Sequence, residues 1–185
     1  MKVAINGFGR IGKLVLRAFL EKNIKGVDLV AINELGSLES SLHLMKYDSI
    51  HGKLPVEISK TKDGIKYGKK IIKFFSERDP LNLPWKELKV DVVLECSGVF
   101  VSKKTASAHI DSGAKKVIIS APGSNVDATI VQGVNNNILK KKHTIISNGS
   151  CTTNCLAPVA MVLDKGVGIE NGFMTTIHSY TGDQR

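Results

Sequence analysis

The feature that most constrains the fold is a glycine-rich turn between a short apolar segment and a helical pattern. Residues 2–6 (KVAIN) have the character of a buried strand, and residues 7–12 (GFGRIG) follow them at once. Apolar side chains then recur at helical spacing up to Phe19, and residues 27–33 (VDLVAIN) resemble a second buried strand. Strand, turn, helix and strand within about 30 residues have the size of a parallel β-α-β unit.

The spacing of the three glycines suits a chain that binds a dinucleotide. Gly7 permits a tight turn, Gly9 lets the backbone approach a pyrophosphate, and Gly12 lets the helix lie close to the strand. Backbone N–H groups around Arg10 and Ile11 then point toward the phosphates from a helix N-terminus. The same glycine spacing also occurs in turns that only pack a helix on a strand, so the flanking strand and helix make the signal specific.

Glu34 indicates which dinucleotide the turn accepts. It ends the second strand, 22 residues after Gly12, where an acidic residue binds the adenosine ribose hydroxyls. A carboxylate at this place repels a 2′-phosphate. The sequence therefore predicts NAD as the cofactor, in preference to NADP.

Later segments extend this unit into a larger sheet. The elements expected from apolar periodicity are a helix at residues 37–45, a strand at 90–95, a helix at 105–112, and strands at 117–120 and 144–147. Residues 51–75 are short, alternating segments interrupted by Asp63 and Gly64, which is typical of antiparallel strands. We predict an α/β fold, a doubly wound (Rossmann), mostly parallel sheet with a small antiparallel excursion.

The pattern changes near residue 148, where we place a domain boundary. Residues 1–149 form the predicted NAD-binding domain, and residues 150–185 the beginning of an α+β catalytic domain. In the second part we expect a helix at about 151–163 and a strand at 172–177. That strand has no evident partner in this sequence, which predicts a truncated second domain.

Cys151 is placed where a helix begins. The helix dipole and nearby N–H groups lower the pKa of a thiol in that position. His178 ends the expected strand and could take the thiol proton, although a histidine at a strand end is commonly only polar surface. Cys155, one turn further along the helix, is expected to be buried. Together with Cys96 these cysteines have poor spacing for zinc, so we expect no metal.

Composition limits the partners. The net charge is +9, but the lysines are scattered in pairs and triplets between apolar segments, and no nucleic-acid-binding signature is present. We interpret them as solvated faces that attract phosphorylated small molecules, and expect no nucleic-acid partner. No apolar run approaches the roughly 18 residues that span a bilayer, and the N-terminus lacks a signal peptide. We therefore expect a cytoplasmic protein with no membrane partner.

Five segments spread over the chain together resemble one enzyme family. They are residues 5–12 (INGFGRIG), 46–49 (KYDS), 95–100 (ECSGVF), 147–155 (SNGSCTTNC) and 178–184 (HSYTGDQ). In content and order they resemble the phosphorylating glyceraldehyde-3-phosphate dehydrogenases. The combination of SCTTNC with NGFGRIG is highly specific for that family.

The resemblance implies a reaction and a role for several residues. Cys151 is the implied nucleophile toward glyceraldehyde 3-phosphate, and His178 activates its thiol. Inorganic phosphate then cleaves the thioester, with Ser150 and Thr152 near this phosphate and Thr181 near the phosphate of the substrate. The implied NAD contacts are Gly7, Gly9, Arg10, Ile11, Gly12, Glu34, Arg78, Ser97, Gly98 and Ser120. The family also implies a homotetramer for the full-length enzyme.

Two departures keep alternatives open. The acidic ribose ligand of the family is usually Asp, and Glu34 with its neighbours resembles the related erythrose-4-phosphate dehydrogenases, as does the region around Trp85. The second departure is length, because about half of the family's chain is absent. A dehydrogenase represented in part and an NAD-binding fragment without turnover therefore remain as separate hypotheses, and we expect the 185-residue chain alone to be inactive.

Overall fold

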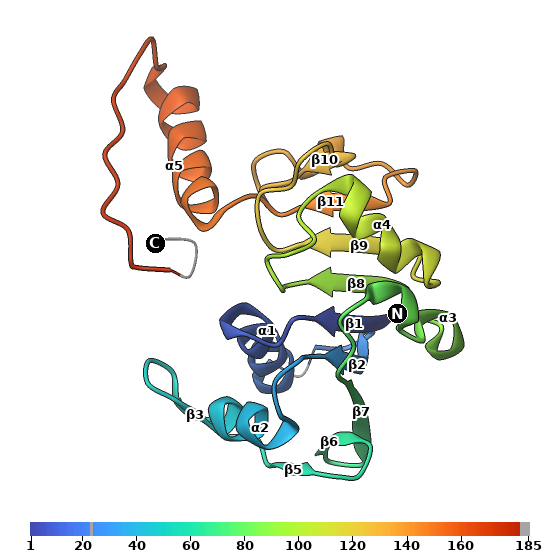
Figure 1. Cartoon of the computed structure of the whole chain (residues 1–185). Coiled ribbons are helices and arrows are strands. Elements are labelled where there is room, and N and C mark those ends of the chain that lie inside the picture. The colour runs from blue at the N-terminus through green and yellow to red at the C-terminus, as the bar shows by residue number, and fades with distance from the viewer. Residues whose placement is uncertain (23, 182–185) are drawn as a thin grey trace.

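The structure is a computed structural model that describes residues 1–22 and 24–181 (Figure 1). The strands are β1 (Lys2–Asn6), β2 (Asp28–Asn33), β3 (Tyr47–Asp48), β4 (Gly52–Lys53), β5 (Ile58–Lys60), β6 (Gly64–Tyr67), β7 (Lys70–Phe75), β8 (Val92–Glu95), β9 (Lys116–Ile119), β10 (Ala128–Thr129) and β11 (Ile145–Ser147). The helices are α1 (Arg10–Glu21), α2 (Leu38–Lys46), α3 (Trp85–Leu88), α4 (Lys103–Asp111) and α5 (Cys151–Val167), with 3₁₀ turns at Pro80–Asn82 and Asn136–Ile138.

A nine-stranded sheet organises these elements. Its strand order is β10-β11-β9-β8-β1-β2-β7-β6-β5, and β3 and β4 form a separate antiparallel pair. Pairing is parallel from β10 to β7 and antiparallel between β7, β6 and β5. The predicted doubly wound sheet with a small antiparallel excursion is confirmed.

The centre of the sheet is β1, which has β2 on one side and β8 on the other. The chain first builds outward through β2 and then returns to continue outward from β8. The carboxyl ends of β1 and β8 therefore form the topological switch point, which is where open α/β sheets bind their ligands.

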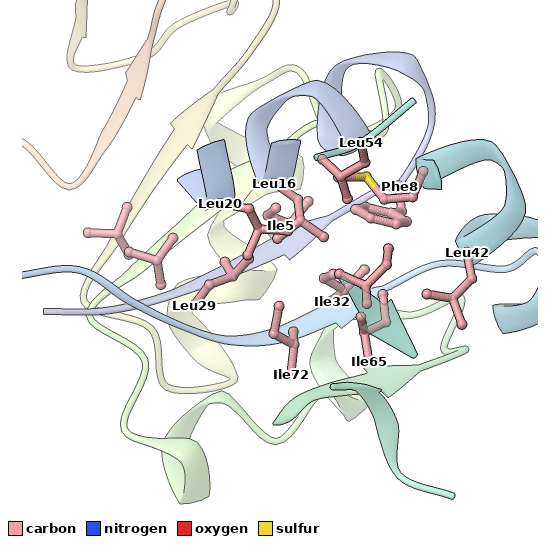
Figure 2. Close-up of a cluster of buried hydrophobic side chains, with 14 residues drawn as sticks. Ile5, Phe8, Leu16, Leu20, Leu29, Ile32, Leu42, Leu54, Ile65 and Ile72 are labelled. Atoms are coloured by element: carbon pink, nitrogen blue, oxygen red, sulfur yellow. The ribbon is translucent and has the colours of Figure 1, made fainter. Parts of the chain in front are cut away.

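Each face of the sheet has its own apolar core, as strand alternation requires. Val3 and Ile5 of β1 join the core beneath α1 and α2, whereas Ala4 joins the core beneath α3 and α4. Figure 2 shows the first core, in which Leu16 of α1 and Leu42 of α2 lie over the sheet. This packing holds the first turn of α1 beside the end of β1.

The expected segments at residues 37–45, 90–95, 105–112, 117–120 and 144–147 correspond to α2, β8, α4, β9 and β11 with small shifts of their ends. β10 and α3, which have only two and four residues, were not predicted from the sequence. Elements of that length carry too few residues for a periodic pattern.

The strand expected at residues 172–177 was wrong. Residues 168–181 form neither helix nor strand, and Figure 1 shows them running from the end of α5 back past that helix. A strand is stabilised by ladder hydrogen bonds to a neighbour, and no described strand pairs with this segment. Residues 182–185, the end of the HSYTGDQR segment, lie outside the described residues.

The prediction that Cys155 is buried was also wrong, because its side chain is exposed. The apolar side chains around it share this exposure, including Leu156 (42 %) and Val159 (56 %). None of the residues of α5 is buried, so the position of Cys155 one turn after Cys151 did not bring it into a core.

Within residues 1–22 and 24–181, no helix has both the length and the apolar character needed to cross a bilayer.

Candidate functional site

A cavity of about 330 Å³ opens at the carboxyl edge of the central strands. Its walls come from the ends of β1, β2, β7 and β8, so it lies at the switch point of the sheet. The lining residues are Asn6, Gly7, Gly9, Asn33, Glu34, Leu35, Glu77, Arg78, Cys96, Ser97, Val99 and Phe100. The strand ends contribute the polar side chains of Asn6 and Asn33, and the following loops contribute both charged and apolar side chains.

The three glycines of the turn have different surroundings. Gly7 has a φ of +87°, and a Cβ built on it would lie 2.4 Å from the backbone nitrogen of Ser97. A Cβ on Gly12 would lie 2.2 Å from the carbonyl oxygen of Gly7, so α1 and the turn are in backbone contact. At Gly9, by contrast, no described atom lies within 4 Å of such a Cβ. Gly9 is thus unobstructed on its Cβ side, and it is one of the residues that line the cavity.

The N-terminus of α1 is available to an anion. Gly9 is its N-cap residue, and no described side chain caps its first N–H groups. The N-cap residues of α4 and α5 differ, because Ser102 and Ser150 each accept a hydrogen bond from a backbone N–H three residues on. Uncapped N–H groups at the positive end of a helix dipole attract phosphate.

Glu34 is held in place by two backbone donors. Its Oε2 accepts a hydrogen bond from the Phe8 N–H at 2.6 Å, and its Oε1 accepts one from the Gly36 N–H at 2.9 Å. Each carboxylate oxygen retains acceptor capacity for a hydroxyl group. The side chain thus fastens the glycine turn and presents a fixed negative charge to the cavity.

The side chain of Arg10 does not line this cavity. Its guanidinium forms a two-pronged ion pair with Asp48, the last residue of β3, and the pair holds the pKa of that carboxyl well below its usual range. Asp48 also accepts hydrogen bonds from the N–H groups of Ile50 and His51. Arg10 therefore anchors the β3–β4 hairpin, and only its backbone remains at the helix N-terminus.

Five of the ten residues expected to contact the cofactor line the cavity: Gly7, Gly9, Glu34, Arg78 and Ser97. The other five, Arg10, Ile11, Gly12, Gly98 and Ser120, are not among its lining residues. Ser120 instead follows β9, where its N–H donates to the carbonyl of Glu95. Beside it, burial raises the pKa of the Cys96 thiol to about 11, an effect that a hydrogen bond with Ser120 partly offsets.

The thiol and imidazole expected to react together lie in contact. Cys151 occupies the first turn of α5, and its Sγ lies 3.1 Å from Nε2 of His178. The Nδ1 of that ring lies 2.6 Å from the carbonyl oxygen of Ser179, which can only accept. In the neutral ring Nδ1 therefore carries the proton, and Nε2 faces the thiol as an acceptor.

This contact changes the acidity of both groups. The hydrogen bond with His178 is the main cause that lowers the pKa of the Cys151 thiol, and a backbone hydrogen bond from Thr152 adds to it. The same contact with Cys151 raises the pKa of His178. Both shifts favour transfer of the thiol proton to the imidazole, which leaves a thiolate.

A second cavity, of about 650 Å³, surrounds this pair. Thr152, Thr181 and Ile11 are among its lining residues, so it adjoins the first turn of α1. Ser150 is the N-cap of α5, and its Oγ accepts a hydrogen bond from the Thr153 N–H at 2.9 Å. The N-terminal ends of α1 and α5 thus border the two cavities.

A buried polar network adjoins the first cavity and was not predicted from the sequence. Asn6, Asn33, Glu95 and His109 have exposed fractions of 5 % or less, and their side chains form a hydrogen-bonded chain. A signal was present, because Glu95 directly follows a run of apolar residues and a buried acid needs partners. Those partners lie on distant segments, so the network itself was not predictable.

Comparisons with known proteins agree with this architecture. Residues 1–103 match the family model described as glyceraldehyde 3-phosphate dehydrogenase, NAD binding domain, and residues 150–185 match the C-terminal domain of the same family. Glyceraldehyde-3-phosphate dehydrogenase of Xanthobacter flavus is 54 % identical over 184 residues. The enzymes of that name from Pseudomonas aeruginosa and Cereibacter sphaeroides are 51 % and 50 % identical.

Each of these matches covers all of this chain and 55 % of the relative. The chain thus spans about half the length of the curated relatives that it matches. Over that half, the glycine turn, the cavity at the switch point and the thiol–imidazole pair occur in one fold with about one residue in two identical. The chain therefore belongs to the glyceraldehyde-3-phosphate dehydrogenase family.

Proposed function

We propose that this chain is the cofactor-binding and nucleophile-bearing part of an NAD-dependent dehydrogenase that oxidises glyceraldehyde 3-phosphate. In this proposal residues 1–149 form the NAD-binding domain, and residues 150–185 contribute to the catalytic domain. The observation that carries the proposal is the 3.1 Å contact between Cys151 Sγ and His178 Nε2 beside the uncapped N-terminus of α1.

The cavity between the strand ends suits NAD. The N–H groups of the first turn of α1 receive the pyrophosphate where Gly9 leaves space, and Glu34 accepts hydrogen bonds from the ribose hydroxyls. The charge of Glu34 disfavours a 2′-phosphate. When bound, NAD would supply the hydride acceptor, and Arg78 and Ser97 line the cavity that would hold it.

The chemical steps use the pair on α5 and the following segment. His178 takes the thiol proton at Nε2, and the Cys151 thiolate attacks the aldehyde carbon to give a thiohemiacetal. The imidazolium and the Cys151 N–H stabilise the developing oxyanion. Bound NAD would accept the hydride of this thiohemiacetal, which would leave a thioester on Cys151. Inorganic phosphate attacks its carbonyl, which releases 1,3-bisphosphoglycerate and regenerates the thiolate.

The anionic groups of this reaction would occupy the second cavity. Thr152 and Thr181 line it with hydroxyl groups, and Ser150 lies at the adjoining helix N-terminus. We assign the attacking phosphate to Ser150 and Thr152, and the phosphate of the substrate to Thr181. The net charge of +9 favours the approach of both anions. In the full-length enzyme we expect a cytoplasmic homotetramer.

The 185-residue chain by itself is proposed to bind NAD without steady turnover. Val162 and Leu163 of α5 are 64 % and 51 % exposed, and residues 168–181 pair with no described strand. A nucleophile on such an uncovered helix lacks a closed site that excludes water.

The test supplies the chain with NAD, glyceraldehyde 3-phosphate and inorganic phosphate and follows NADH formation. We expect no steady phosphate-dependent rate from the chain alone. Turnover that disappears in Cys151→Ser would overturn the proposed inactivity and support the assigned chemistry. Turnover that persists in Cys151→Ser would overturn the assignment of the nucleophile.

A further inference from the structure

Glu95 lies at the centre of the buried network and accepts four hydrogen bonds. Its Oε2 accepts from Asn6 Nδ2 at 2.6 Å and is 2.8 Å from His109 Nε2. Its Oε1 accepts from the Ser97 backbone N–H at 2.7 Å and also from the Ser97 hydroxyl. The side chain is 1 % exposed, so these four donors replace the water that a carboxylate otherwise requires.

The contact with Trp85 determines which ring nitrogen of His109 carries the proton. The indole of Trp85 can only donate, and its Nε1–H lies 3.0 Å from Nδ1 of His109. Nδ1 is therefore the acceptor in the ring. His109 consequently carries its proton on Nε2 and donates it to Glu95.

The contact with Asn33 determines the orientation of the side-chain amide of Asn6. The Glu77 backbone N–H donates to Asn33 Oδ1, which places the NH₂ group of Asn33 against the side-chain oxygen of Asn6. Asn6 must then turn its own NH₂ group toward Glu95. Both arms thus point their donors at one carboxylate, one from Asn6 of β1 and the other from His109 of α4.

The network reaches the nucleotide cavity at the turn after β8. The backbone nitrogen and Cα of Ser97 lie so close to Gly7 that a Cβ on that glycine would be 2.4 and 2.5 Å from them. Ser97 also accepts, at its Oγ, a hydrogen bond from the Val99 N–H at 3.1 Å. If Ser97 shifted, it would therefore press on the glycine turn and change the shape of the cavity wall.

We propose that Glu95 is a positioning residue of the nucleotide cavity, whose carboxylate holds the Ser97 turn against the Gly7 turn. Trp85, His109, Asn33 and Asn6 orient this carboxylate from behind and do not themselves set the turn. The function of the turn in binding NAD rests on the function proposed above, whereas the positioning of Ser97 does not.

The geometry predicts what Glu95→Gln would change. The amide offers one acceptor oxygen and one NH₂ group, and the two fixed donors of Asn6 and His109 require the oxygen on their side. The NH₂ group must then face Ser97, whose hydroxyl can accept from it but whose backbone N–H loses its acceptor. The variant should therefore loosen the Ser97 turn while the Trp85 end of the network stays intact.

Two readouts on the whole 185-residue chain test this. The first is the rate at which iodoacetamide alkylates Cys96, the residue before Ser97, measured by peptide mapping with no nucleotide present. The second is the NAD affinity by calorimetry. Emission from Trp85, the single tryptophan of the chain, reports whether the network and its surrounding core remain folded.

For Glu95→Gln we expect about tenfold faster alkylation of Cys96 and about tenfold weaker NAD binding, the size of one hydrogen bond to a charged group. Trp85 emission should stay as in the wild type. The matched control is Asp91→Asn, which changes a carboxylate that binds Lys115 at the far end of β8 and should leave both readouts unchanged.

A folded Glu95→Gln chain with wild-type alkylation of Cys96 would overturn the proposal. If that variant fails to fold, Ser97→Ala replaces it, because it removes only the hydroxyl bonds and should still accelerate alkylation about threefold. An unchanged rate there would also overturn the proposal. If the wild type does not bind NAD while the variant exposes Cys96, the proposed function fails and the positioning role stands.

Discussion

Substitution of alanine at Gly12 and at Gly9 should separate the packing role of the glycine turn from its binding role. At Gly12 the added Cβ meets the backbone oxygen of Gly7 at 2.2 Å and a side-chain carbon of Ile5 at 3.2 Å. Neither neighbour is the end of a flexible side chain, so α1 must move away from β1. At Gly9 the added Cβ meets no described atom within 4 Å.

The magnitudes follow from these contacts. Overpacking costs about 1–3 kcal/mol, and a backbone clash lies at the upper end of that range. Replacing glycine in a helix returns at most about 1 kcal/mol, so we expect Gly12→Ala to lose about 2 kcal/mol of unfolding free energy. For a chain of this length that corresponds to a melting temperature about 4–8 °C lower. For Gly9→Ala, loss of a favourable N-cap residue and reduced entropy of the unfolded chain nearly offset one another.

The assay is thermal unfolding followed by circular dichroism, with NAD affinity measured on the same samples. Gly12→Ala should lower both the melting temperature and the affinity. Gly9→Ala should keep the melting temperature within about 2 °C and still weaken NAD by about tenfold, because its methyl group occupies the space assigned to the pyrophosphate. A Gly12→Ala chain that melts at or above the wild-type temperature would refute the packing argument, and full NAD affinity in Gly9→Ala would refute the binding argument.

Two further predictions concern titratable groups. Cys151 should be alkylated fastest of the three cysteines, because His178 lowers the pKa of its thiol. His178→Asn should slow the alkylation of Cys151 and shift its pH dependence to higher pH. Faster alkylation of Cys96 or Cys155 in peptide mapping would contradict this prediction. Asp127→Asn should cost about 1 kcal/mol near neutral pH, because Lys103 and two backbone N–H groups lower the pKa of the Asp127 carboxyl in the folded state. That stability is present above the unfolded pKa and is lost as pH falls through the lowered folded pKa, so denaturant titrations of the two chains should converge in acid.

The fold could be predicted to a large extent because its strongest signals are local. The turn at residues 7–12 and the apolar strands around it carry their pattern within about 30 residues. The strand expected at 172–177 lacked this support, since strands depend on partners from elsewhere in the chain. Residues 172–177 have the composition of a strand, but no described strand pairs with them.

The candidate site divides in the same way. The placement of Gly7, Gly9 and Glu34 at the cavity was predictable because the backbone of a β-α-β unit fixes these positions. The side chain of Arg10 was not, because its preference for Asp48 depends on a hairpin 38 residues away. The donors around Glu95 are Asn6, Ser97 and His109, which lie in three separate segments, and only the assembled sheet brings Asn6 and His109 to it.

The most direct test of the central claim is a calorimetric titration of the 185-residue chain and of Glu34→Ala with NAD and, separately, with NADP. The account predicts one saturable NAD site in the wild type, weaker NADP binding, and a loss of about 1–3 kcal/mol of NAD binding free energy in Glu34→Ala. Equal affinity of the wild type and the variant for NAD would contradict the role assigned to Glu34. No binding of either nucleotide to the wild type would contradict the assignment of the cavity itself.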